Sequence, residues 1–237
     1  MAASQDGVTA LMLAARGGHM AVTKLLLEQT ALRSQHGSHL MAARRDGAAA
    51  LMLAARGGHV AVAKLLLEQG ADVRAAKQNG VTALMLAAQG GHVDAAKLLS
   101  EHGADVKAVA QNGITVLMSA AQGGHLPVAK LILRHGADVN AAQIDGSTAL
   151  MLAADGGHLA LAKLLLEQGA HVRAARQDGV VALMAAVQHG NVAMATLLLE
   201  RRADVNAATH GGITALMVAA DNGHKAVTEL LLQYGAA

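Results

Sequence analysis

The chain has 237 residues, of which 53% are hydrophobic, yet it contains no Phe, no Trp and a single Tyr, so thin layers of closely packed helices are favoured over a wide interior. With 19 basic and 17 acidic side chains, the sequence offers neither the basic cluster nor the aromatic platforms of a nucleic-acid binder. Cys is absent, which excludes disulfides, thiolate metal sites and cysteine nucleophiles.

The amino-terminal sequence carries no targeting pattern. Residues 1–6 lack the basic start and long apolar run of a secretory signal, and no stretch approaches 18 uninterrupted apolar residues. We therefore expect a soluble intracellular protein of the cytoplasm, with no membrane partner.

A repeat with a period of 33 residues organises the sequence. A glycine that usually follows Asp or Asn recurs seven times, with a first interval of 40 residues and five further intervals of 33. These glycines are Gly7, Gly47, Gly80, Gly113, Gly146, Gly179 and Gly212. A fixed period of this length is typical of stacked repeat proteins. We predict a single domain over residues 1–237, with repeats that start near residues 6, 46, 79, 112, 145, 178 and 211.

Each repeat predicts two helices and a hairpin, as the third repeat illustrates. Residues 81–88 predict a short helix with Thr82 as its N-cap, and the pair Gly90-Gly91 ends this helix, where a positive φ is needed. A second helix is predicted over about residues 93–102. Residues 104–113 then predict an extended turn whose Asn-Gly pair makes the tight reversal.

These repeats resemble the ankyrin repeat. The family pattern is close to D-x-x-G-x-T-P-L-H-L-A-A-x-x-G-H, followed by an apolar helix and L-L-L-x-x-G-A-D-V-N. Residues 146–158 and 136–140 reproduce it almost position by position, and the match covers the chain from about Asp6. The resemblance implies an all-α ankyrin-repeat solenoid of stacked helix-turn-helix units with short hairpin fingers. It also implies a module that binds a partner protein or peptide on a concave groove.

Two columns of residues depart from the family pattern. Met replaces the family His in every repeat, at Met12, Met52, Met85, Met118, Met151, Met184 and Met217. Their neighbours are Leu and Ala, so we expect these side chains to fill the core rather than to form an exposed binding stripe. The capping Thr is lost at Ala49 and Val181. An N-cap contributes about 1 kcal/mol, so the second and sixth repeats are expected to be the weakest.

The first repeat carries a seven-residue insertion near residues 30–40. By register it falls in a hairpin connection, where a longer surface loop adds little entropy cost. A tolerated loop and a partner-specific finger both remain open. His36 and His39 lie in it, but two ligands without a nearby carboxylate or Cys argue against a metal site.

Catalytic chemistry finds no support in the sequence. One His or Asn follows the glycines after the first helix of each repeat, at His19, His59, His92, His125, His158, Asn191 and His224. A residue repeated once per repeat indicates a structural role. No Ser, His and Asp spacing suggests a triad, and the Gly-Gly pairs lack the Lys-Ser or Lys-Thr of a phosphate loop. We expect no enzyme activity, no cofactor and no metal site.

The resemblance places a partner against the hairpin tips and the outer side of the first helices. The matching helix positions run from basic through neutral to acidic side chains: Arg16, Arg56, Gln89, Gln122, Asp155, Gln188 and Asp221. The hairpin positions add Arg44, Arg45, Lys77, Gln78 and Gln111. We therefore expect an acidic or polar segment to lie across the first four repeats.

A second interpretation is a designed or recently duplicated repeat scaffold, whose main property is self-association or structural spacing. The near-identity of the repeats favours it, whereas the drift from Arg to Asp favours an interaction module. The terminal repeats scarcely differ from the interior ones, although the ends of a solenoid normally carry a polar face. Either the chain is cut from a longer array or its ends associate with another copy, so we also expect some end-to-end contact between copies, which would form a homo-oligomer.

Overall fold

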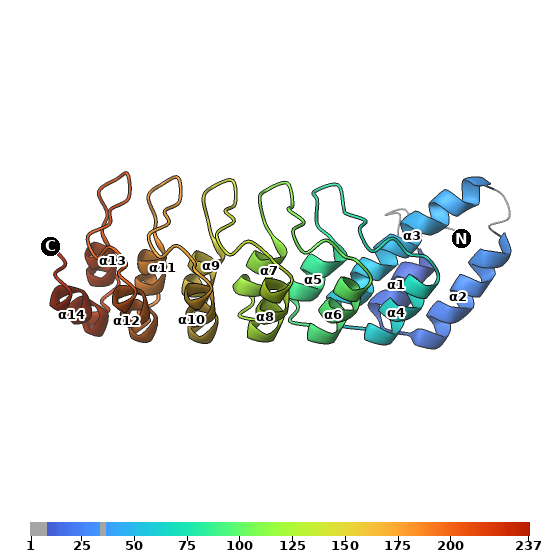
Figure 1. The fold of residues 1–237 in the computed structure, drawn as a ribbon, viewed down its shortest axis with the longest axis horizontal. Coiled ribbons are helices and arrows are strands. Elements are labelled where there is room, and N and C mark those ends of the chain that lie inside the picture. The colour runs from blue at the N-terminus through green and yellow to red at the C-terminus, as the bar shows by residue number, and fades with distance from the viewer. Residues whose placement is uncertain (1–8, 34–36) are drawn as a thin grey trace. The chain divides into compact units, whose positions relative to one another are not determined.

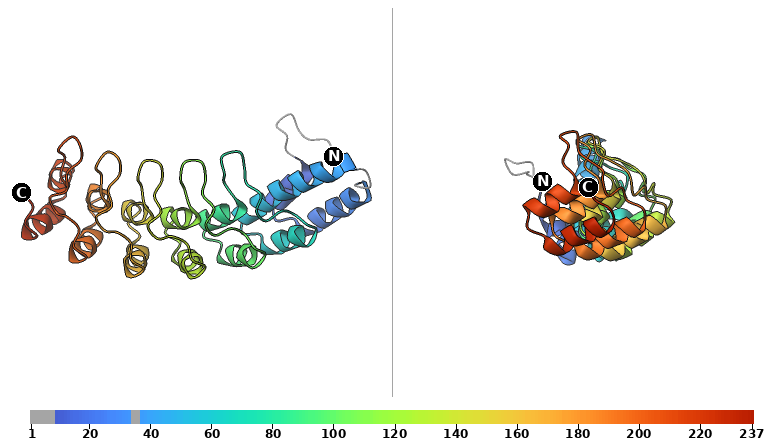
Figure 2. Two further views of the ribbon diagram at one scale, coloured as in Figure 1. Left: turned by 45° about the horizontal axis from the view of Figure 1, so that its top comes forward. Right: turned by 90° about the vertical axis from the view of Figure 1, so that its left-hand side faces the viewer.

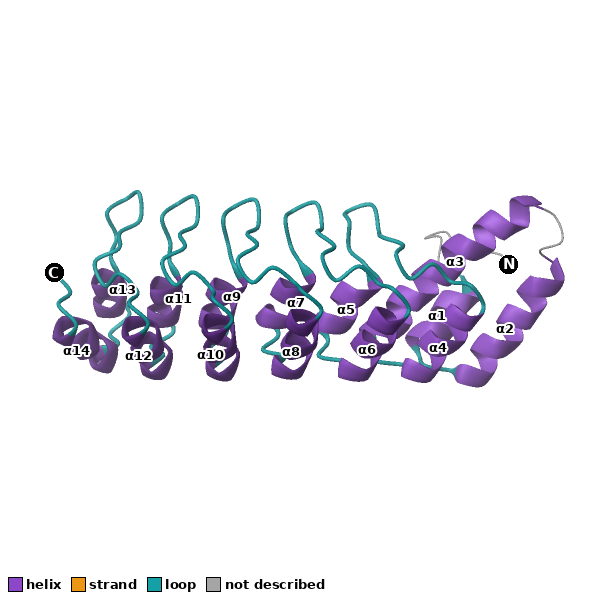
Figure 3. Cartoon of the chain, viewed as in Figure 1, coloured by secondary structure: helices purple, strands orange, loops and turns teal. Residues whose placement is uncertain are grey.

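The computed structural model of the chain describes residues 9–33 and 37–237, and over residues 30–44 it describes no side chains. The described residues form fourteen helices and no strand, apart from isolated antiparallel bridges at the bases of hairpins (Figure 1). Loops join the helices (Figure 3). Two compact bodies divide the chain, an amino-terminal body of Met1–Gln111 and a carboxy-terminal body of Asn112–Ala237.

Three helix pairs build the amino-terminal body. They are α1 (Ala10–Arg16) with α2 (Met20–Arg33), α3 (Gly37–Arg56) with α4 (Val60–Glu68), and α5 (Ala83–Gln89) with α6 (Val93–Glu101). The first helices of the pairs, α1, α3 and α5, pack in one row, and α2, α4 and α6 pack in a second row (Figure 2).

Four helix pairs build the carboxy-terminal body in the same way. They are α7 (Val116–Gln122) with α8 (Leu126–Arg134), α9 (Ala149–Asp155) with α10 (Leu159–Glu167), α11 (Ala182–Gln188) with α12 (Val192–Glu200), and α13 (Ala215–Asp221) with α14 (Lys225–Gln233). Within this body each helix packs against its counterpart in the next pair. The predicted all-α stack of helix pairs is confirmed.

Thr side chains start most of the short first helices. The hydroxyl oxygen of each capping Thr accepts the backbone N–H three residues later, at 3.2–3.4 Å. The capping residues are Thr9, Thr82, Thr115, Thr148 and Thr214. Val181 stands at the N-cap of α11 and provides no side-chain bond. The missing cap of the sixth repeat is therefore confirmed, while its effect on stability stays a prediction.

The second repeat departs from the predicted plan. Ala49 is not at an N-cap but inside α3, which already begins at Gly37. Gly47, whose counterparts lie in hairpin tips, is helical as well. The predictions of a missing cap at Ala49 and of a loop or finger near residues 30–40 are wrong for the described backbone, because α2 continues to Arg33. Residues 40–56 are rich in Ala, Leu, Met and Arg, which favour a helix.

The Met column mostly lies in the core. Met52, Met85, Met118, Met151 and Met184 are at most 5% exposed. Met12 is half-buried, and Met217 is 52% exposed because no further helix pair of the described chain covers α13. The core prediction is thus confirmed for five positions and wrong for Met217. None of the described helices is both long and apolar enough to cross a membrane.

Candidate functional site

A Gln residue joins neighbouring hairpins by two hydrogen bonds at once. In the amino-terminal body, the backbone N–H of Gln111 donates to the carbonyl of Asn79 at 2.9 Å, and its Nε2 donates to the carbonyl of Gln78 at 2.7 Å. We call this pair of donors the Gln clamp. It recognises two successive carbonyls of the preceding hairpin.

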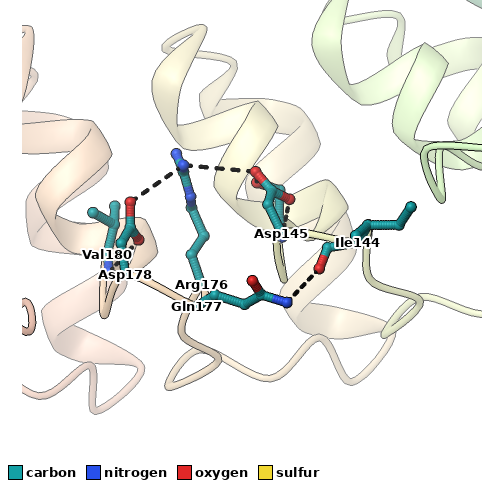
Figure 4. A network of polar contacts seen from close by, with 7 residues as sticks. Ile144, Asp145, Arg176, Gln177, Asp178 and Val180 are labelled. Carbon is teal, nitrogen blue, oxygen red and sulfur yellow. Dashed lines mark hydrogen bonds and ion pairs between the residues drawn. The ribbon is translucent and has the colours of Figure 1, made fainter.

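The carboxy-terminal body contains a second Gln clamp. Gln177 donates its backbone N–H to the carbonyl of Asp145 at 2.8 Å and its Nε2 to the carbonyl of Ile144 at 2.7 Å (Figure 4). The backbone bond alone recurs where Gln is replaced: Ile144 donates to Asn112 at 3.1 Å, and His210 donates to Asp178 at 2.9 Å. Ile144 and His210 thus make the backbone bond without the side-chain bond, and the complete clamp requires Gln at this register position.

Charged side chains reinforce the hairpins around Gln177. The Arg176 guanidinium lies 3.6 Å from the Asp145 carboxylate and 3.3 Å from the Asp178 carboxylate (Figure 4). Bonds from the backbone N–H and the hydroxyl of Ser147, together with the charge of Arg176, hold the pKa of Asp145 below its usual value. These groups are largely exposed, so solvent screening keeps the contribution of the ion pairs to stability small.

A hollow of about 770 Å³ lies in the amino-terminal body between α3 and the connection that follows α4. Ala48 and Met52, which are 9% and 5% exposed, line its floor. Three predicted partner residues, Arg45, Lys77 and Gln78, also line it and are exposed. The fold therefore brings together residues that the sequence assigned to two different repeats.

A smaller hollow of about 360 Å³ lies in the carboxy-terminal body. The connections that precede α11 and α13 form it, with Arg173, Arg176, Asp204 and His210 among its lining residues. The Nε of Arg173 is bound to the carbonyl of Arg202 at 3.0 Å, and Arg176 faces two carboxylates. This hollow therefore offers less unpaired positive charge than its larger counterpart.

The predicted helix positions of the groove are the last residues of the first helices. In the amino-terminal body they are Arg16, Arg56 and Gln89, and in the carboxy-terminal body they are Gln122, Asp155, Gln188 and Asp221. All seven are exposed. Residues that differ among near-identical repeats thus present their side chains to solvent.

The backbone carbonyls at four of these helix ends accept hydrogen bonds from His side chains of the next repeat. The Nε2 of His59 contacts the carbonyl of Arg16 at 3.0 Å, and the Nε2 of His92 contacts that of Arg56 at 2.9 Å. His158 and His224 repeat this contact in the carboxy-terminal body, at 3.3 and 3.1 Å. A carbonyl only accepts, so each Nε2 carries the proton. The structural role predicted for these histidines is confirmed.

The contact between the fifth and sixth repeats is made by different residues. Asn191, which replaces the His, caps α12 by accepting the N–H of Met194 at 3.0 Å. His189 instead contacts the carboxylate of Asp155 at 3.1 Å. Asp155, a predicted partner residue, is therefore already engaged within the carboxy-terminal body.

The remaining predicted positions differ in their availability. Gln111 is exposed, but both of its donors are used in the Gln clamp. The side chain of Arg44 lies outside the described residues, as do those of His36 and His39. Within the described part of the chain, no three His, Asp or Glu residues gather closely enough to hold a metal ion.

Ile144 is not among the partner positions predicted from the sequence. It is 68% exposed and occupies a hairpin position where three other repeats have Gln78, Gln111 and Gln177. It is an exposed apolar side chain in an otherwise mostly polar column, and aligning the repeats in register would have identified it.

Comparison with protein-family models identifies the repeats of the chain. A family model described as ankyrin repeats in three copies matches six overlapping segments, residues 2–77, 32–110, 51–143, 105–176, 140–209 and 171–237. A search of curated proteins finds none that matches the chain.

Proposed function

Because the chain belongs to the ankyrin repeat family, whose repeats are generally protein–protein interaction modules, we propose that it binds a partner protein or peptide along its hairpins and first helices. One observation carries the proposal. The residues at the ends of the first helices change along the chain from Arg through Gln to Asp, and all seven side chains there are exposed. The proposal assigns the chain no catalytic step and no cofactor, and it places the encounter with the partner in the cytoplasm.

Charge favours an acidic or polar partner segment on the amino-terminal body. Arg16, Arg45, Arg56 and Lys77 are exposed there, on the helices and hairpin that the proposal invokes. Arg is among the residues that most often dominate binding energy, and complementary charge speeds association. The acidic counterparts Asp155 and Asp221 belong to the carboxy-terminal body, so we expect them to contribute less to binding an acidic segment.

Reversing three arginines tests the proposal. We expect the R16E/R45E/R56E protein to lose, in affinity capture followed by mass spectrometry, the partners that the unchanged protein retains. The matched control is K24E/K64E/K97E, which reverses three exposed charges on α2, α4 and α6. An identical set of captured proteins for the arginine variant and the unchanged protein would show that the basic residues are not a partner site.

A second candidate function is association between copies. Leu13, Val22 and Leu25 of the first helix pair are 57%, 49% and 55% exposed, and Leu232 and Tyr234 of the last pair are 54% and 43% exposed. Exposed apolar surface favours contacts between proteins. We expect the sedimentation coefficient to rise with protein concentration. A constant monomer value at high concentration would reject self-association.

A further inference from the structure

The hairpin that precedes α5 carries a Gln clamp without its two acceptors. Gln111 and Gln177 each bind the carbonyls of residues 33 and 32 positions earlier. For Gln78 the same register points to Arg45 and Asp46. Both lie inside α3, where carbonyls accept N–H groups from the next helical turn. In residues 9–33 and 37–237, neither the N–H nor the Nε2 of Gln78 finds an acceptor.

The open clamp borders the hollow beside α3. Its volume of about 770 Å³ lies within the usual range of ligand pockets. The small side chains of Ala48 and Ala49 line it and leave room for a backbone to approach closely, and Met52 adds apolar surface. Gln111 binds carbonyls of the hairpin that precedes it, but the corresponding residues before Gln78 belong to α3. The space beside Gln78 is therefore open.

The rim of the hollow is basic. Arg45 and Lys77 are exposed and line it. Its acidic lining residue is Asp72, whose Oδ1 accepts the backbone N–H of Arg74 at 2.9 Å and so is directed into its own turn. A ligand that carries negative charge therefore complements the rim.

We propose that this hollow binds an extended acidic peptide segment of the partner protein, which takes the place of the missing hairpin. Two successive carbonyls of the segment accept the N–H and Nε2 of Gln78, as two successive hairpin carbonyls do at Gln111. Acidic side chains of the segment pair with Arg45 and Lys77, and a small apolar side chain lies on Ala48 and Met52. A helical segment does not fit this role, because its carbonyls are already bonded within the helix. The mode is the addition of an extended strand to an open edge.

This proposal rests on the proposed function but is tested with a defined ligand. The probe is a fluorescent, acetylated and amidated heptapeptide of alternating Val and Glu, and binding is followed by fluorescence anisotropy. We expect Gln78→Ala to weaken its affinity by about threefold to tenfold, as for loss of one hydrogen bond. R45E/K77E should weaken it by more than about tenfold, as should replacing every Glu of the peptide by Gln.

Matched controls separate the hollow from general charge and folding effects. Lys107→Glu reverses an exposed charge outside the hollow, and Gln168→Ala truncates an exposed Gln of the carboxy-terminal body; both should leave the affinity unchanged. Circular dichroism verifies that each variant is folded. No measurable binding of the acidic peptide, or equal affinity for R45E/K77E and the unchanged protein, overturns the proposal.

Amide hydrogen exchange measured by NMR tests the clamp itself. In the free protein the Gln78 amide should exchange much faster than the Gln111 amide, and the peptide should slow Gln78 alone. Slow exchange of Gln78 without peptide would overturn the proposal, because the edge would already be paired. Capture with R16E/R56E, which leaves the hollow intact, tests the proposed function separately, so that either proposal can fail alone.

Discussion

Gly58→Ala is expected to lower the free energy of unfolding by about 2–3 kcal/mol. Gly58 has a φ of 68°, and a residue with a Cβ in this left-handed region costs about 1–2 kcal/mol. The added Cβ would also lie 2.5 Å from Nδ1 of His92. The ring would have to leave the carbonyl of Arg56, and the loss of that hydrogen bond costs about 1 kcal/mol more.

Gly70→Ala is the matched control for Gly58→Ala. Gly70 has a similar φ of 81°, but a Cβ added there meets no atom within 4 Å. We therefore expect Gly70→Ala to cost only the backbone strain, about 1–2 kcal/mol. Urea denaturation followed by circular dichroism measures both. Equal losses in the two variants would show that the His92 contact does not stabilise the junction between repeats.

The contact between the His ring and the glycine of the preceding repeat affects more than one hydrogen bond. In a stack of repeats each repeat contacts only its neighbours, so cooperativity depends on the interfaces between them. The His ring lies close to the glycine with positive φ that ends the first helix of the preceding repeat, at Gly18 and Gly58 in the amino-terminal body and at Gly124 and Gly190 in the carboxy-terminal body. A side chain at these glycines loosens the interface as well as straining the backbone.

Periodicity made most of the fold predictable. The 33-residue interval aligned the Thr caps, the Gly-Gly helix ends and the Met column, and each alignment corresponds to a repeated contact. The histidines could be recognised as structural on the same ground, although the carbonyls they contact could not be named. Those carbonyls belong to the backbone. Every residue type has a backbone carbonyl, so the residue that accepts the hydrogen bond cannot be identified from the sequence.

The same periodicity misled the prediction at α3. Alignment with the other repeats placed a hairpin around Gly47 and a cap at Ala49, although the surrounding Ala, Leu and Arg favour a helix. One glycine does not prevent a helix, since it costs only about 1 kcal/mol relative to Ala. Local preference prevailed here over the pattern of the other repeats.

The candidate site could be predicted in part. Arg45, Lys77 and Gln78 stand out in the sequence, but the hollow they line exists only because α3 replaces a hairpin. The open clamp at Gln78 likewise depends on the absent hairpin. Ile144 could have been found, because it interrupts a column of Gln residues. Two kinds of irregularity are therefore informative in a repeat protein. At Ile144 the residue differs from that of the other repeats, and at Gln78 the residue is the same but the preceding segment is a helix instead of a hairpin.

Met118→Ala is expected to lower the free energy of unfolding by about 2–5 kcal/mol, the usual cost of truncating a buried Met. Met118 is 1% exposed and lies on α7, at a position where the family pattern has His. The control is Met217→Ala at the corresponding position of α13, where the side chain is 52% exposed. Because that side chain buries little surface, we expect a loss below about 1 kcal/mol. Chemical denaturation of both variants checks the difference, and similar losses would contradict the assignment of the Met column to the core.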